Sequence, residues 1–390
     1  MKKILILCLV LITSGCAGTG TTTSGDDKAP LELKPASFSD LPGWGNDRLD
    51  GFVGAYRTSC ARILKKSPSE KFSSNSAFGT YGEWQKPCRD IASVDAGSPA
   101  AVRSFLERNF KVMRATAAGN PEGLFTGYYE STLNGSRIKH GAFQYPLLGR
   151  PSDLVMVELG DFREELKGQR IAGRVLDGKL KPYESRAQIE AGKLPASQYR
   201  PIVYLDDPHD AFFVQVQGSG VVHMDDGSIM RVGYDGQNGH PYYAIGRELV
   251  KRGIYTKDEV SMDSIRAWLT QNPDKAEELM NTNPSFVFFK EQPNDGAGAG
   301  PQGGEGVALT TKRSLAIDRG KLPYGFPVYL DADYADETGA KLQRLMMAQD
   351  TGGAIRGAVR GDVFWGGGAM AEKMAGPMKA KGRYYFLLPK

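Results

Sequence analysis

The segment 349–366 reads QDTGGAIRGAVRGDVFWG and holds the densest set of informative residues in the chain. Two carboxylates, Asp350 and Asp362, stand twelve residues apart, and each follows a short run that is compatible with a β-strand. The glycine pair after the first aspartate permits a tight turn, because glycine leaves room where another strand or a ligand approaches. Trp365 beside Asp362 offers a flat face for a sugar ring and a less polar setting, which raises the pKa of a general acid.

Two simpler interpretations of this segment compete with an acid/base pair. An Asp close to Gly is often only a turn residue. Aspartic proteases also carry Asp-Thr-Gly, but that class needs two such elements that share a proton. The sequence has one Asp-Thr-Gly, at Asp350, so the protease interpretation is disfavoured.

Composition indicates an ordinary globular, β-rich protein. The chain has 390 residues, of which 41% are hydrophobic, 48 are Gly and 22 are Pro, and this implies many turns. The formal net charge is only +4. Because the sequence also lacks a dense basic stripe, nucleic acid is not an expected partner.

The N-terminus predicts export and lipid attachment. A Lys pair precedes an apolar run over 4–12, which is too short to span a bilayer but suits a secretory signal over 1–15. Small residues then lead to Cys16, as in bacterial lipoprotein signals; an ordinary signal peptide with an incidental Cys is the alternative. Ala17 favours the outer membrane, and residues 16–38 are expected to form a lipid-anchored flexible tether.

Cys60 and Cys88 remain once the leader and Cys16 are set aside. In an oxidising periplasm they would form a disulfide, and two small buried thiols are the alternative. No CxxC element or His-rich spacing occurs, so no metal site is predicted.

Apolar spacing predicts helices in the first third of the chain and strands after residue 123. Phe212, Val214 and Val216 alternate with other residues, which indicates a strand. The predicted helices span 47–64, 98–118, 245–250 and 261–269 and begin again at 272. The predicted strands span 124–130, 212–217, 307–309, 328–330, 345–348 and 384–388.

The segment 349–366 resembles the C-terminal 3D (three-Asp) module, with Asp318, Asp350 and Asp362 as its aspartates. Further blocks extend this to a resemblance to the membrane-bound lytic murein transglycosylase A family over about residues 40–390. They read FTGYYE at 125–130, VQVQGSG at 214–220, NPSFVFF at 283–289, and LT at 309–310 with RSLA at 313–316. The joint presence of these blocks in this order makes the resemblance specific.

The resemblance implies a mainly β fold with flanking helices. Members fold as a double-psi β-barrel into which a second, smaller β domain is inserted, with a substrate groove between the two. The barrel domain would comprise residues 39–131 and 239–390, with the 3D module at 307–390. The inserted domain would comprise residues 132–238.

The resemblance also implies an activity. Members cleave the β-1,4 bond between N-acetylmuramic acid (MurNAc) and N-acetylglucosamine (GlcNAc) in peptidoglycan and leave 1,6-anhydro-MurNAc ends. Asp362 maps to the single acid/base residue and Asp350 to a supporting acid. A usual glycosidase needs two carboxylates, but here the sugar's own 6-hydroxyl is the nucleophile, so neither a second catalytic group nor a cofactor is expected.

Other polar residues are candidates for substrate contacts or for support of the fold. Candidate sugar contacts, for each of which a purely structural role is the alternative, are Thr126, Tyr129, Gln215, Gln217, Ser219, Arg356 and Trp365. Asp318 is expected to brace the barrel. Glu130 is expected to be a solvated strand-end residue rather than a second carboxylate at the groove.

The expected partners are peptidoglycan glycan strands and the outer membrane, which the lipid on Cys16 would enter from the periplasmic face. Other cell-wall enzymes are candidate partners. Two other functions stay open: a non-catalytic peptidoglycan-binding lipoprotein, and a muramidase-type hydrolase of the same bond.

Overall fold

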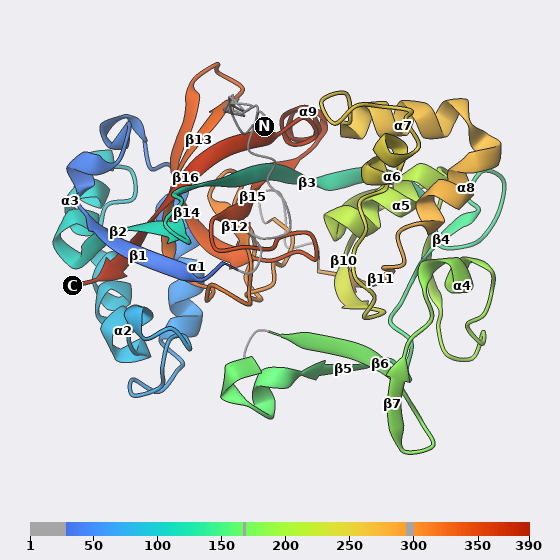
Figure 1. Ribbon diagram of the computed structural model, residues 1–390, viewed down its shortest axis with the longest axis horizontal. Helices are drawn as coiled ribbons and strands as arrows, with labels where there is room; N and C mark the ends of the chain where they lie inside the picture. The colour runs from blue at the N-terminus through green and yellow to red at the C-terminus, as the bar shows by residue number, and fades with distance from the viewer. Residues whose placement is uncertain (1–28, 167–168, 294–299) are drawn as a thin grey trace, which may run out of the picture.

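The computed structural model describes residues 29–166, 169–293 and 300–390, which form two lobes joined by one long strand (Figure 1). The predicted signal peptide, Cys16 and the first part of the tether lie outside the described residues. No helix in the described part of the chain is long and apolar enough to cross a membrane.

The first lobe is a closed ring of six strands. Strand β16 pairs with β13 at one side and with β3 at the other, and β14, β12 and β15 complete the circuit. The bounds are β3 Glu122–Ser136, β12 Ser314–Ile317, β13 Pro327–Ala335, β14 Lys341–Asp350, β15 Arg360–Gly367 and β16 Lys379–Pro389. The mainly β fold with flanking helices is therefore confirmed, whereas the double-psi crossing of the barrel strands stays a prediction.

Apolar strands fill the barrel. All four residues of β12 are buried, and β16 changes from an alternating pattern to a continuously buried run over 384–388. A strand that is covered on both faces is expected to be apolar throughout. The predicted strands 328–330, 345–348 and 384–388 are confirmed, whereas 307–309 is a loop in which Ala308 forms only an isolated bridge with Gln302.

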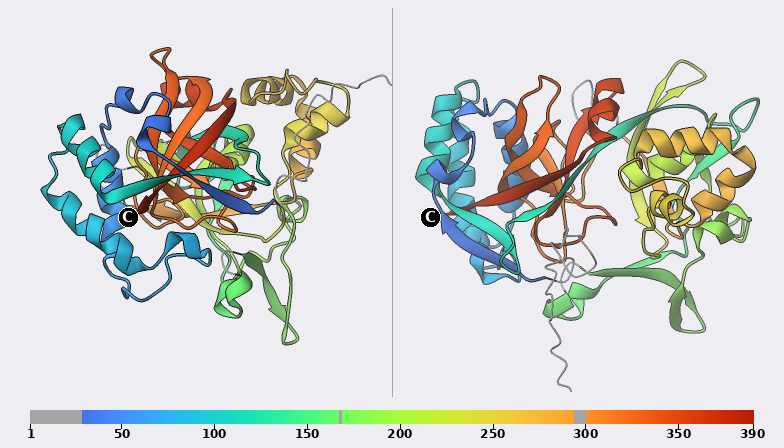
Figure 2. Two further views of the ribbon diagram at one scale, coloured as in Figure 1. Left: turned by 60° about the vertical axis from the view of Figure 1, so that its left-hand side comes forward. Right: turned by 45° about the horizontal axis from the view of Figure 1, so that its top comes forward.

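Helices α1 (Phe52–Ile63), α2 (Tyr81–Asp90) and α3 (Pro99–Asn109) pack on the side of the barrel away from the second lobe (Figure 2). A disulfide between Cys60 and Cys88 joins α1 to α2, with their Cα atoms 5.2 Å apart. The two cysteines therefore form the disulfide rather than two separate buried thiols.

The predicted helix over 98–118 is confirmed in its first half and wrong in its second half. Ser98 caps α3 by accepting a hydrogen bond from Ala101 N, but the helix ends at Asn109 and Phe110–Ala117 forms strand β2. Strand β2 pairs with β16 and with β1 (Leu31–Ala36), a segment that the sequence assigned to the tether. These pairings satisfy the backbone polar groups that a longer helix would otherwise have satisfied.

The second lobe begins where β3 leaves the barrel. Its strands pair with the far half of β3 and with one another, and helices cover them. The main strands are β4 Tyr145–Leu148, β8 Pro201–Leu205, β9 Ser219–Met224, β10 Ile229–Gln237 and β11 Val287–Gln292. A separate sheet comprises β5 Val155–Glu158, β6 Arg170–Leu176 and β7 Lys179–Pro182, and the helices are α4 Arg186–Glu190, α5 Pro208–Gln217, α6 Ile245–Lys251, α7 Met262–Gln271 and α8 Pro273–Asn281.

Helices α6 to α8 occur where the sequence predicted them, and Ser261 caps α7 by accepting a hydrogen bond from Ser264 N. They form an apolar cluster with Phe212 and Phe213 of α5, while β11 pairs with β10. These contacts place residues 239–292 in the second lobe, whereas the division inferred from the sequence assigned them to the barrel domain.

The predicted strand over 212–217 is wrong, because this segment is part of helix α5. Asp207 caps the helix by accepting hydrogen bonds from His209 N and Asp210 N, and Pro208 occupies its first turn. Gly218 follows the last turn with φ of +85°, which favours glycine. These helix signals outweigh an alternation that spans only three apolar residues.

A buried ion pair fixes the N-terminal segment to the barrel. Arg313 donates from Nη2 to Asp47 Oδ1 at 2.8 Å and from Nη1 to Asp47 Oδ2 at 2.9 Å. Both side chains are at most 4% exposed. Burial by itself would raise the pKa of Asp47, but the hydrogen bonds and charge of Arg313 bring it below the ordinary value.

We expect Asp47→Asn to lower the free energy of unfolding by about 3 kcal/mol, because it leaves the Arg313 guanidinium buried without a counter-charge. Urea denaturation measures the loss. Asp50→Asn is the matched control, since that side chain is 72% exposed. Equal small losses for both variants would contradict this role for the pair.

Candidate active site

Strand register brings the two aspartates of segment 349–366 to one face of the barrel. Ala316 on β12 pairs with Asp362 on β15 and with Asp350 on β14. Two strand spacings separate the aspartate backbones by about 10 Å. On the other side of β15, Thr126 of β3 pairs with Asp362, so four strands present their side chains together.

Asp362 is lightly held and partly open. Arg360 Nη1 donates to Asp362 Oδ1 at 3.1 Å, and no described residue donates to Oδ2. The Asp362 side chain is 18% exposed. Arg360 Nη2 donates to Thr126 Oγ1 at 2.9 Å, so Thr126 orients the guanidinium that contacts the carboxylate.

Asp350, by contrast, has both oxygens occupied. Oδ2 accepts from the Tyr128 hydroxyl at 2.7 Å, and Oδ1 accepts from Gly304 N at 2.8 Å and Thr351 N at 2.9 Å. Burial raises the pKa of Asp350, the three hydrogen bonds oppose this, and the charge of Asp362 adds to it. Asp350 therefore lies in a network of three hydrogen-bond donors.

Tyr128 is an active-site residue that the sequence reading did not single out. Its ring centroid lies 5.2 Å from that of Phe364, its partner on β15. Burial, followed by the charge of Asp350, raises the pKa of Tyr128 far above the ordinary value. The phenol therefore stays protonated and remains a donor to Asp350.

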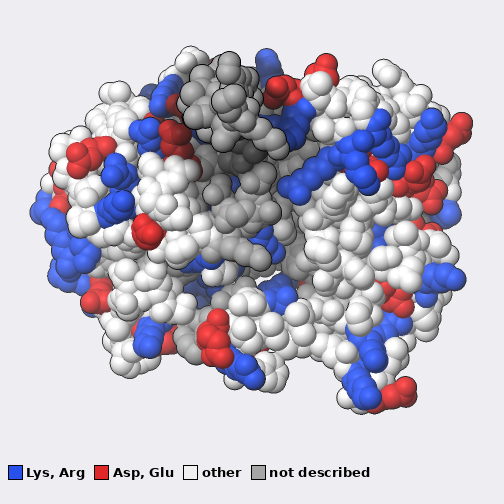
Figure 3. Space-filling model, in the orientation of Figure 1, with Lys and Arg blue, Asp and Glu red and all other residues white. Residues whose placement is uncertain are grey.

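Tyr242 of the second lobe lies next to the turn that follows Asp350. A Cβ on Gly353 would lie 3.5 Å from Tyr242 Cβ, so the turn after Asp350 meets this residue closely. Burial raises the pKa of Tyr242 to about 12, and the charge of Asp362 contributes. Figure 3 shows an opening between the lobes below the residues drawn in grey. The only local signal for Tyr242 was the aromatic pair that it forms with Tyr243.

Asp318 braces the barrel turn, as expected. Its Oδ2 accepts from Gly357 N at 2.8 Å and its Oδ1 from Gly320 N at 2.9 Å, while the residue is 4% exposed. Arg356 lies 3.7 Å from Asp318 and its side chain is 56% exposed. Arg356 is thus placed beside Asp318, and a sugar contact for it stays a prediction.

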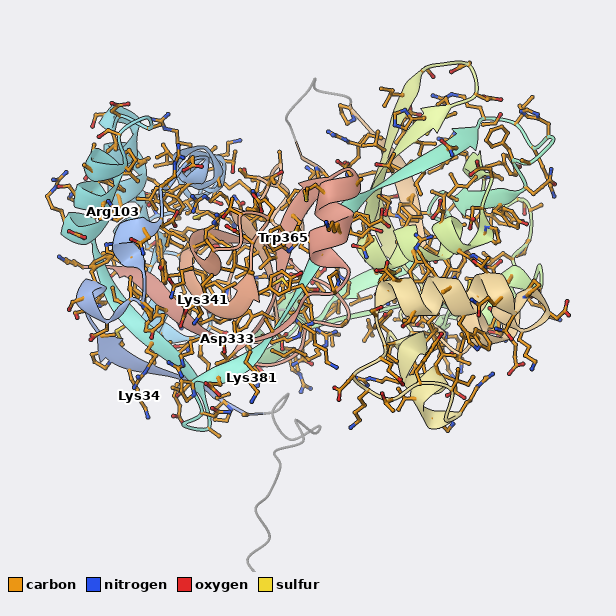
Figure 4. The ribbon with its side chains drawn as sticks, turned by 90° about the horizontal axis from the view of Figure 1, so that it is seen from above. Lys34, Arg103, Asp333, Lys341, Trp365 and Lys381 are labelled. Carbon is orange, nitrogen blue, oxygen red and sulfur yellow. A yellow bond between two sulfur atoms is a disulfide. The ribbon has the colours of Figure 1, made fainter. Side chains whose placement is uncertain are left out.

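Trp365 does not form the expected sugar platform beside Asp362. It is buried, and its indole N–H contacts Met378 Sδ at 3.4 Å. Figure 4 shows it inside the barrel lobe next to helix α9 (Ala369–Ala375). The reason is strand alternation: a residue three positions from Asp362 points to the opposite face.

Three further candidates have structural hydrogen bonds in or beside helix α5. Buried Gln215 accepts from Arg186 Nη2 and Val287 N, each through Oε1. Gln217 Oε1 accepts from Tyr129 N at 3.1 Å. Tyr129 is 3% exposed and donates its hydroxyl to Glu372 Oε1 at 2.8 Å, on the face of β3 opposite Tyr128. These contacts contradict direct sugar-binding roles for Gln215 and Tyr129.

Ser219 and Glu130 are also buried. Ser219 lies in β9 opposite Gly233. Glu130 was expected to be solvated, but it is 5% exposed and lies 3.1 Å from Arg231 Nε, and burial raises its pKa. The pair sits where β3 passes from one lobe to the other, which explains why a strand-end position is covered.

Within 29–166, 169–293 and 300–390, no group of three or more His, Cys, Asp or Glu is placed to hold a metal ion. The side chains on the Asp362 face are a carboxylate pair, a guanidinium, two phenols and a hydroxyl. This set suits proton transfer and hydrogen bonding to a polyhydroxyl ligand.

Comparison with known proteins finds one consistent group of relatives. Residues 124–290 match the MltA specific insert domain and residues 313–388 match the 3D domain. The membrane-bound lytic murein transglycosylase A of Vibrio cholerae is 31% identical over 300 residues, which cover 75% of this chain and 72% of that protein.

Solved structures agree with these matches. A crystal structure of a membrane-bound lytic murein transglycosylase from Agrobacterium tumefaciens has a TM-score of 0.80 and 31% identity, covering 92% of this chain and 98% of that chain. The structure of Escherichia coli MltA with bound chitohexaose has a TM-score of 0.61 and 27% identity, covering 93% of this chain and 94% of that chain.

The loop that binds Asp350 contains a titratable group at its base. Glu305 is 8% exposed, and Ser59 Oγ donates to its Oε2 at 2.7 Å. Its own N–H donates to Gln349 O at 2.9 Å, next to the Gly304 N–H that binds Asp350. Burial raises the pKa of Glu305 from 4.5 to about 7, against a smaller opposing effect of Ser59, Arg62 and Arg319.

This shift predicts a pH-dependent stability. The folded state holds the Glu305 proton more tightly than the unfolded state, so the stabilisation is complete below pH 4.5 and is lost as pH rises to about 7. The expected loss is about 3 kcal/mol. Glu305→Gln should remove this part of the pH dependence while keeping an acceptor for Ser59.

Thermal unfolding at pH 5 and pH 8 measures the effect. Glu122→Gln, on an exposed carboxylate that pairs with Arg383, should retain the wild-type difference between the two pH values. If Glu305→Gln also retains it, Glu305 is not the titrating group.

Proposed function

The chain belongs to the membrane-bound lytic murein transglycosylase A family, and on this premise we propose that it cleaves the MurNAc–GlcNAc β-1,4 bond to leave 1,6-anhydro-MurNAc ends. The enzyme is a peptidoglycan lytic transglycosylase. The observation that supports the formation of anhydro ends by a single aspartate is the contrast between Asp350 and Asp362. Among the described residues, three donate to Asp350, whereas one donates to Asp362 and none to its Oδ2.

Asp362 serves as acid and then as base. In its protonated form it donates to the glycosidic oxygen as the bond to the muramic acid breaks. The resulting carboxylate takes the proton of the 6-hydroxyl, whose oxygen closes the anhydro ring. Because this hydroxyl belongs to the reacting sugar, no water need be positioned, and the entropy of bringing a second reactant is avoided.

The neighbouring residues act on Asp362. Arg360, held by Thr126, stabilises the carboxylate that forms after the first proton transfer. Tyr128, Gly304 and Thr351 fix Asp350 beside the site. We place the sugar chain between the lobes, with Tyr242 on its far side. The E. coli relative was solved with bound chitohexaose, which supports sugar binding by this chain.

A muramidase-type hydrolase is the second candidate. The backbones of the two aspartates lie about two strand spacings apart, which is compatible with a water between their carboxyl groups, as in an inverting glycosidase. The full set of donors on Asp350 weighs against its acting as that base. A non-catalytic binding protein would bind sacculi, the isolated peptidoglycan shells, without producing new sugar ends.

The cell location extends the same proposal. The relatives are named membrane-bound, and Cys16 with its preceding signal supports a lipid anchor facing the periplasm from the outer membrane. Glycan strands would be the partner there, and other cell-wall enzymes remain candidate partners. We also retain the inserted-domain organisation as a proposal, which the separate matches at 124–290 and 313–388 support.

Asp362→Asn should abolish release of anhydro-muropeptides from purified sacculi, because Asn supplies neither the acid nor the base. Chromatography of the soluble products measures the loss, expected to be at least about 1,000-fold. Asp333→Asn is the matched control, since Asp333 lies on β13 with a 67% exposed side chain and should keep full activity. Normal product release by the Asp362 variant would overturn the assignment.

Tyr128→Phe should lower kcat about tenfold with a small change in KM, because it removes one donor from Asp350 without removing the ring that packs on Phe364. The same product assay reports the rates. Tyr204→Phe, on β8 of the second lobe, is the control. Unchanged kcat in Tyr128→Phe would show that the Asp350 network does not support catalysis.

A further inference from the structure

A polar cavity lies behind the strand that carries Tyr128. Neighbouring strand residues point to opposite faces, so Tyr128 contacts Asp350 while Tyr129 opens on a cavity of about 260 Å³. Strand β3 and helices α5, α7 and α9 line it, and α9 lies next to α7 above β3 (Figure 1). The lining residues are Tyr129, Ser131, Thr132, Asp210, Arg266 and Glu372.

Side chains from both lobes line the cavity, and contacts within each lobe hold them. Arg266 Nη1 of α7 contacts Asp210 Oδ1 of α5 at 2.8 Å, and its guanidinium lies 4.5 Å from the centroid of the Phe213 ring. Tyr129 donates to Glu372 Oε1 of α9 at 2.8 Å. The charged groups are therefore fixed in place rather than free in solvent.

Two polar atoms at this cavity have no partner among the described residues. They are Ser131 Oγ and Arg266 Nε. Ser131 is only 4% exposed. Buried polar atoms in folded proteins nearly always form hydrogen bonds, so this hydroxyl is positioned to hydrogen-bond a ligand in the cavity.

The charges select the kind of ligand. Arg266 supplies one positive charge, while Asp210 and Glu372 supply two negative charges in the cavity wall. Asp206 and Asp207 lie close enough to act on Asp210 electrostatically. The excess of carboxylates favours a cation, and the hydroxyls of Ser131 and Thr132 favour one that also carries hydrogen-bonding groups.

We propose that this cavity binds the ammonium end of an amino-acid group, with the ammonium between Glu372 and Asp210 and a neighbouring polar group on Ser131 and Arg266. On the basis of the proposed function, the source is the peptide stem of peptidoglycan, whose diamino acid carries a free ammonium beside a carboxylate. The enzyme would thus hold a peptide stem on one face of β3 and cut glycan on the other.

Calorimetry with the tripeptide L-Ala-D-Glu-meso-diaminopimelate tests the site directly. Wild-type protein should bind the tripeptide, and acetylation of its side-chain amine should weaken binding at least about tenfold. Glu372→Gln should weaken binding of the unmodified tripeptide to a similar extent, because Gln keeps the acceptor for Tyr129 but loses the charge. Glu277→Gln, an exposed carboxylate on α8, should leave it unchanged.

Activity on two substrates separates this site from the catalytic one. Glu372→Gln should slow cleavage of peptide-bearing sacculi and leave cleavage of peptide-free glycan strands at the wild-type rate. Equal slowing on both substrates, absence of tripeptide binding, or equal binding of the acetylated tripeptide would each overturn the inference. If wild-type protein binds the tripeptide but forms no anhydro ends, the proposed function fails while this site stands.

Discussion

The active-site face depends on the backbone pairing that places Ala316 between Asp362 and Asp350. A slip of one residue in any of these strands would turn an aspartate to the opposite face. Gly361 helps to prevent such a slip. A slip would bring a residue that has a Cβ to the position of Gly361, where the Cβ would collide with the Tyr384 hydroxyl inside the barrel. Closure of the barrel by β16 against β3 then fixes Thr126 beside Asp362.

This constraint gives two identical side chains different roles. Asp350 accepts hydrogen bonds from two backbone N–H groups and a phenol, so its carboxylate is stabilised by groups of the protein itself. Among the described residues, Asp362 accepts only from the Arg360 guanidinium, and its side chain stays 18% exposed. In many active sites, two nearby carboxyl groups take different acid and base roles because their environments differ. In the mechanism that we propose, one aspartate takes both roles and the substrate hydroxyl replaces the second.

Several barrel strands and the aspartate pair could be predicted from the sequence, because their signals are local, whereas the barrel itself was implied by the family resemblance. Strand alternation should also have placed Trp365 away from Asp362, and the Asp207–Pro208 start should have identified helix α5. Tyr128 and Gly304 could not be linked to Asp350 in this way, because these contacts join residues 222 and 46 positions apart. Likewise, β2 is a strand because β1 and β16 pair with it, which its own apolar spacing does not reveal.

The central claim is that the muramic acid 6-hydroxyl, rather than water, attacks once Asp362 has protonated the leaving oxygen. Digestion of sacculi in water enriched in oxygen-18, followed by mass spectrometry of the new sugar ends, tests it most directly. The account predicts products lighter than hydrolysed ends by one water and free of the heavy isotope. Reducing muramic acid ends that carry one oxygen-18 atom, formed from the start of the reaction, would contradict it.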